Sequence, residues 1–144
     1  MQDRFKFRAW LHSDGLTPKM VYDIEKMDNF RTWIAQEDKD PVMQCTGLCD
    51  KTGKLIFEGD ILKVTGSRDT SGYGVVEYLQ AGCQYFVNGY LDYPSPYHPR
   101  RKGEFYRQLQ EWLCTEVIGN IYENSELLGR NANILDIINK AKEE

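Results

Sequence analysis

Apolar and polar side chains alternate along many short stretches of this chain, which is typical of β-strands with one face in a core. In residues 5–10, Phe5, Phe7 and Ala9 fall on one side, while Lys6, Arg8 and Trp10 fall on the other. Seven further stretches are expected to be extended, at residues 19–22, 42–45, 54–57, 61–64, 74–79, 84–87 and 116–122. Hairpin spacing and intervening turns predict a mainly β protein: a small antiparallel barrel-like domain, SH3-like or a sandwich.

Two other stretches contain apolar residues at helical spacing. Residues 30–34 are one, and the pattern ends before Pro41. Residues 104–113 are ambiguous, because their apolar positions fit a helix, whereas Phe105, Arg107 and Leu109 also fit one face of a strand. Between the expected strands, residues 66–74 form a polar, glycine-containing segment that we expect to be a loop.

The end of the chain has a different pattern. Ile134, Leu135, Ile137 and Ile138 recur at helical spacing, so we expect an amphipathic C-terminal helix. This divides the chain into a mostly β domain, residues 1–128, and a short helical tail, residues 129–144. The apolar stripe is expected to dock on its own domain or on a second subunit, and Ile134, Leu135 and Ile138 are the candidate contacts for a homo-oligomer.

Composition limits what the protein can do. The 144 residues are 41% hydrophobic and 28% charged, as in an ordinary globular domain, and the net charge is -4. A protein that binds polyanions through bulk charge is usually basic, so that class is excluded. No apolar run is long enough for a signal peptide or a membrane span, so we expect a cytoplasmic protein without membrane contact.

The residue types that carry catalysis or bind metals form no recognisable motif. Cys45, Cys49, Cys83 and Cys114 lack both the spacing of a zinc site and a secretory context, so they are expected to be reduced thiols. The acidic residues Asp50, Glu58 and Asp60 are close in sequence, but neither histidine, His12 or His98, lies near them. We interpret these acids as turn-forming surface residues, and we expect no catalytic residue, metal or cofactor.

A basic and aromatic cluster is the one sequence feature that indicates a ligand. Arg100, Arg101 and Lys102 follow Tyr97 in a proline-rich stretch, and Arg68 can extend the cluster. Positive charge beside aromatic rings is typical of sites that bind single-stranded nucleic acid by stacking and phosphate contact. The alternative is a solvated loop on an acidic protein.

Three stretches together resemble the YopX family of bacteriophage and prophage proteins. They are Phe7-Arg8-Ala9-Trp10, residues 43–61 (Met-Gln-Cys-Thr-Gly through Glu-Gly-Asp-Ile) and residues 116–128 (Glu-Val-Ile-Gly-Asn-Ile-Tyr-Glu-Asn onward). Their order and spacing match the family pattern. The resemblance implies a mostly β fold and brings no established activity with it.

These observations together favour a non-enzymatic protein-interaction module that acts on a host or phage protein in the cytosol of a bacterial host. The alternative is a nucleic-acid-binding accessory protein that uses residues 97–102.

Overall fold

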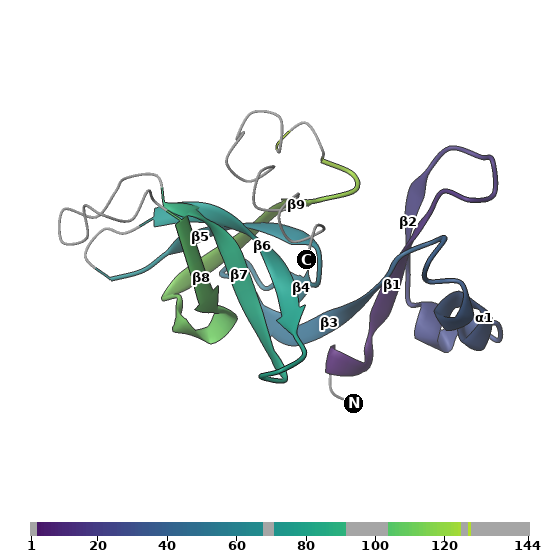
Figure 1. Ribbon diagram of the computed structural model, residues 1–144, viewed down its shortest axis with the longest axis horizontal. Helices are drawn as coiled ribbons and strands as arrows, with labels where there is room; N and C mark the ends of the chain where they lie inside the picture. Colours follow the sequence, from purple (N-terminus) through teal and green to yellow (C-terminus); the bar gives the residue numbers. More distant parts are fainter. Residues whose placement is uncertain (1–2, 68–70, 92–103, 125–126, 128–144) are drawn as a thin grey trace.

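The computed structural model describes residues 3–67, 71–91, 104–124 and 127. This part of the chain contains nine strands in two antiparallel sheets, with one short α-helix and three 3-10 turns (Figure 1). The predicted mainly β class is therefore confirmed. The predicted helical tail, residues 129–144, lies outside the residues that the structure describes.

The first sheet has the strand order β2-β1-β3-β4. Its strands are β1 (Phe7–Leu11), β2 (Lys19–Tyr22), β3 (Val42–Cys49) and β4 (Leu55–Phe57). Helix α1 (Phe30–Ala35) confirms the expected helical spacing and packs on this sheet, since the Phe30 ring lies 5.3 Å from the Phe7 ring. The 3-10 turn η2 (Ile24–Lys26) precedes the helix and buries Ile24.

Strands β1 and β2 and helix α1 form an arm that projects from one end of the molecule, at the right of Figure 1. Strand β3 runs from this arm to the second sheet. The prediction for residues 5–10 is wrong in two respects. Phe5 is not in the strand but in the 3-10 turn η1 (Asp3–Phe5), where its side chain is exposed. The polar side of the strand is not solvated either, because Arg8 is buried against the second sheet.

The second sheet has the strand order β8-β7-β6-β5-β9 and curls into a half-barrel (Figure 1). Its strands are β5 (Asp60–Thr65), β6 (Ser71–Leu79), β7 (Gln84–Leu91), β8 (Glu104–Gln108) and β9 (Cys114–Asn120). The main core lies on its inner face and consists of Ile56, Leu62, Val64, Val76, Val87, Phe105, Leu109 and Trp112. Strand β6 begins at Ser71, so the loop expected at residues 66–74 is shorter than predicted.

The ambiguous stretch 104–113 is a strand followed by a turn. Residues 104–108 pair with β7 as strand β8, and Leu109–Glu111 form the 3-10 turn η3. Phe105, Leu109 and Trp112 all enter the same core, which explains why both a helical and an extended spacing fitted them. Pairing with β7 makes residues 104–108 a strand rather than a helix. The local sequence pattern does not show such pairing.

Candidate functional site

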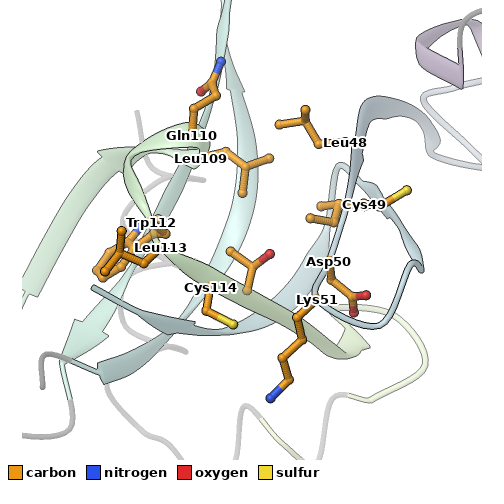
Figure 2. Close-up of a pocket in the computed structure, with 11 residues that line it drawn as sticks. Leu48, Cys49, Asp50, Lys51, Leu109, Gln110, Trp112, Leu113 and Cys114 are labelled. Carbon is orange, nitrogen blue, oxygen red and sulfur yellow. The ribbon is translucent and has the colours of Figure 1, made fainter. Parts of the chain in front are cut away.

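A cleft opens between the turn that joins β3 to β4 and the segment that leads from η3 into β9 (Figure 2). Its volume is about 310 Å³, near the lower limit for small-molecule sites. We call it the β3–β9 cleft. Its lining residues are Leu48, Cys49, Asp50, Lys51, Ile56, Leu109, Gln110, Trp112, Leu113, Cys114 and Thr115.

The floor of the cleft is apolar. Ile56, Leu109 and Trp112 belong to the main core and are almost fully buried. Trp112 also makes an edge contact with Phe105, with ring centroids 4.8 Å apart. A ligand that enters the cleft therefore meets a rigid part of the core rather than mobile surface side chains.

Two leucines flank this floor and remain in solvent. Leu113 is 76% exposed and Leu48 is 40% exposed. Figure 2 shows Leu48 on the β3 side and Leu113 beside Trp112 on the opposite side. Leu48 reaches this position because the β3–β4 pairing is irregular between Cys45 and Cys49, where Gly47 has a φ of 83°. Such a bulge redirects the side chains that follow it.

Asp50 holds the β3–β4 turn against β9. Its Oδ1 accepts hydrogen bonds from the Thr52 backbone N–H (2.9 Å), the Thr52 hydroxyl (2.7 Å) and the Lys54 N–H (2.9 Å), and its Oδ2 accepts one from the Val117 N–H (2.9 Å). Burial alone would raise the pKa of Asp50, but these four donors stabilise the carboxylate and lower the pKa to about 2.

Lys51 adds two further contacts across the cleft. Its backbone N–H donates to the Thr115 carbonyl oxygen at 2.9 Å, and its Nζ lies 2.8 Å from Glu116 Oε2. The ion pair is half exposed, so it contributes little to stability. Together with Asp50, Lys51 fixes the distance between the two walls of the cleft.

The polar groups of the cleft include two thiols. Cys49 and Cys114 are free thiols, and Figure 2 shows their sulfur atoms pointing to different sides. Within residues 3–67, 71–91, 104–124 and 127, no group of three metal-ligating side chains is placed to hold an ion. The arrangement is suited to binding an apolar group.

Two of the three acids expected on the surface, Asp50 and Asp60, are buried and Glu58 is half-buried, which corrects that prediction. Asp60 is 2% exposed and pairs with Arg8, and its Oδ2 accepts the Phe57 N–H at 2.8 Å. Glu58 Oε1 accepts the Gln44 N–H at 3.0 Å, and burial raises the pKa of this carboxyl. The turn-forming part of the prediction is confirmed, because Asp50 and Asp60 hold the backbone of the two turns.

The structure does not test the residues that the sequence singled out for binding. Those of the basic cluster, Arg68, Tyr97, Arg100, Arg101 and Lys102, lie outside the described residues, as do Ile134, Leu135 and Ile138 of the tail. Leu48 and Leu113 were not predicted from the sequence. A signal for Leu113 was present: it directly follows Trp112, and two adjacent apolar residues in extended chain point to opposite sides.

Comparisons with known proteins give one family and a structural neighbour. The sequence model of a family described as YopX protein matches residues 6–129. The search of curated proteins finds no match. Among solved structures, the chain is similar to "Crystal structure of protein EF1440 from Enterococcus faecalis", with 25% identity and a TM-score of 0.41. The similarity covers 85% of this chain and 96% of that chain. In the part of the chain that the structure describes, no helix has the length and apolar character of a membrane span.

Proposed function

This chain belongs to the YopX family, and we propose that it is a non-enzymatic protein-interaction module of a phage or prophage that acts in the cytosol of the bacterial host. The β3–β9 cleft is its contact surface, and the partner is a host or phage protein that inserts an apolar side chain there. The observation that carries this proposal is the exposure of Leu113, at 76%, beside an apolar floor.

The energetics favour a protein contact at this position. Covering an exposed leucine fully removes apolar surface from water and contributes about 1.5–3 kcal/mol. Leu48, Leu113 and the buried residues Ile56 and Trp112 all line the cleft, so an inserted apolar side chain meets apolar surface there. An apolar anchor in a preformed pocket is the arrangement that dominates binding energy in protein interfaces.

The carboxylates support a non-enzymatic role. Asp50 and Asp60 use both of their oxygens on backbone and side-chain donors within the fold. Asp60 is also almost fully buried, so it is poorly placed to exchange a proton with a substrate. Both residues have structural roles that account for their burial.

The proposal is tested by capture of the tagged chain from bacterial lysate, with half of the lysate treated with nuclease. Leu113→Glu places a charge in the interface, and Leu16→Glu is the matched control, since Leu16 is 70% exposed in the turn between β1 and β2. We expect a protein that binds the wild type and Leu16→Glu equally in both halves and is lost with Leu113→Glu.

Two results would contradict the proposal. Equal recovery of every bound protein by Leu113→Glu and the wild type would show that the cleft is not the contact surface. Recovery only from the untreated half would favour the alternative, a nucleic-acid-binding accessory protein that uses residues 97–102.

A further inference from the structure

Strand β2 leaves one edge of the first sheet open. It is the outermost strand, and among the described residues only β1 pairs with it (Figure 1). Trp10 donates its N–H to the Pro41 carbonyl oxygen, on the β3 side, so it makes no ladder bonds with Met20, its partner in β2. The backbone N–H and C=O groups of Met20 and Tyr22 therefore point away from β1. Such groups are a template for a further strand.

A pocket lies along the same strand. Its volume is about 450 Å³, which is within the range of ligand-binding sites. We call it the β2 pocket, and it shares no lining residue with the β3–β9 cleft. It lies between the arm and the turn that follows β9, and its lining includes Trp10, Lys19, Met20, Tyr22, Tyr122 and Glu123.

Aromatic rings and one carboxylate dominate this pocket. The rings of Trp10 and Tyr122 are stacked, with centroids 5.7 Å apart and planes that differ by 20°. Tyr22 is 48% exposed. Glu123 is also exposed, and its Oε1 accepts a hydrogen bond from Asn120 Nδ2 at 3.0 Å, which orients the carboxylate. Aromatic faces and a carboxylate together stabilise a cation.

The nearby positive charges do not oppose a cation in the pocket. Lys19 lines it, but side chains alternate along a strand, so the Lys19 side chain points to the sheet face opposite to that of Tyr22. Arg8 is on the same face as its cross-strand partner Tyr22, but it is buried and paired with Asp60 at 2.8 Å. Of the charged residues that line the pocket, Glu123 is therefore the one that faces an occupant.

We propose that an extended segment of a partner protein pairs with β2 and inserts an arginine side chain into the β2 pocket. Residues opposite one another in neighbouring strands have their side chains on the same face, so a residue opposite Met20 projects onto the face that contains Trp10. Backbone hydrogen bonds to the edge strand supply affinity, and the pocket supplies specificity. Arginine fits best, because its planar guanidinium both stacks on aromatic rings and pairs with carboxylates. The site is independent of the function proposed for the β3–β9 cleft.

The test is fluorescence anisotropy of a labelled heptapeptide of alternating threonine and valine, with blocked ends and arginine in place of the central valine. Citrulline in place of arginine keeps the shape and removes the charge, so it should weaken binding by about twofold to thirtyfold. Glu123→Gln should weaken binding of the arginine peptide and make the two peptides bind alike. Glu111→Gln is the matched control and should change neither affinity, since Glu111 is an exposed acid in η3, outside the pocket.

The pairing with β2 is tested in the peptide backbone. Arginine opposite Met20 directs its own N–H and those of the two valines toward β2, while the threonine N–H groups point away. N-methylation of both valines should therefore abolish binding, and N-methylation of the two threonines beside the arginine should preserve it.

Circular dichroism verifies that each protein variant is folded. The proposal is overturned if the arginine peptide shows no saturable binding at low salt, or if the citrulline peptide binds as tightly, since the pocket would then not select a cation. Equal loss of binding by both methylated peptides would overturn the pairing with β2. Leu113→Glu should bind the arginine peptide like the wild type, so a failure here is distinguishable from a failure at the β3–β9 cleft.

Discussion

Arg8 and Asp60 form a buried ion pair that connects the two sheets. Arg8 Nη2 lies 2.8 Å from Asp60 Oδ1, and the side chains are only 3% and 2% exposed. The same guanidinium donates to the Glu58 carbonyl oxygen at 3.1 Å and lies over the Phe57 ring. Arg8 is in β1 and Asp60 begins β5, so the pair joins the arm to the half-barrel. Burial raises the pKa of Asp60, while Arg8 opposes that shift.

Replacement of Arg8 by Met should therefore destabilise the protein strongly. It leaves the Asp60 carboxylate buried without its partner, which typically costs about 3–5 kcal/mol. Arg8→Lys keeps the positive charge and should cost less. Urea unfolding of the two variants measures the difference in the free energy of unfolding. Equal stability of Arg8→Met and Arg8→Lys would show that the charge of Arg8 is not what the fold requires.

Asp50 should make stability depend on acidic pH. Its folded pKa is lowered from 3.8 to about 2, so its contribution is present above the unfolded pKa and is lost as the pH falls toward 2. We expect the stability difference between the wild type and Asp50→Asn to shrink by about 1–2 kcal/mol between pH 6 and pH 2. Urea titrations at several pH values measure it. A difference that stays constant over this range would contradict the assignment.

The strand pattern was largely predictable because it depends on neighbouring residues. In residues 61–64, Leu62 and Val64 enter the main core, and Lys63 is exposed on the other face, as strand alternation requires. The turn at residues 50–53 was predictable for the same reason. Gly53 has a φ of 90°, and its N–H donates to the Asp50 carbonyl oxygen. These features need no information from distant parts of the chain.

Long-range partners account for what the pattern missed. The local pattern predicts that Arg8 is a surface residue. In the folded chain it lies beside Asp60, which is 52 positions later in the sequence. The β3–β9 cleft likewise needs Leu48, near the end of β3, and Leu113, just before β9, which line the same cleft only in the folded chain. A local alternation pattern reports which side of a strand a residue occupies, but it cannot report what covers that side.

A close approach between two strands makes Gly89 sensitive to substitution. Gly89 is opposite Gly74 in the β6–β7 pair, and a Cβ at Gly89 would collide with the Tyr73 carbonyl oxygen. Gly89→Ala should lower stability by about 1–3 kcal/mol, as overpacking usually does. Gly82→Ala is the control, because its Cβ would make only an ordinary contact, 3.7 Å from Leu79 Cδ2. Thermal unfolding should separate the two variants, and similar midpoints would contradict the predicted clash.

The thiols provide a chemical probe of the β3–β9 cleft. Cys49 and Cys83 are exposed, whereas Cys45 is buried and burial raises the pKa of its thiol. N-ethylmaleimide should therefore modify Cys49 and Cys83 well before Cys45, because only the thiolate of an accessible cysteine reacts. Mass spectrometry of the digested protein measures the order. Early modification of Cys45 would contradict its burial.

The same reagent connects thiol accessibility to partner binding. Cys49 lines the cleft, so an adduct there should reduce capture of the partner protein, while an adduct on Cys83, in the β6–β7 turn, should not. The Cys49→Ser/Cys114→Ser double variant separates the two effects, because it removes both thiols that line the cleft, so the reagent then modifies Cys83 and leaves the cleft open. We expect this variant to bind its partner equally with and without the reagent. If the reagent reduces capture by the double variant as much as by the wild type, the lost binding does not arise at the cleft.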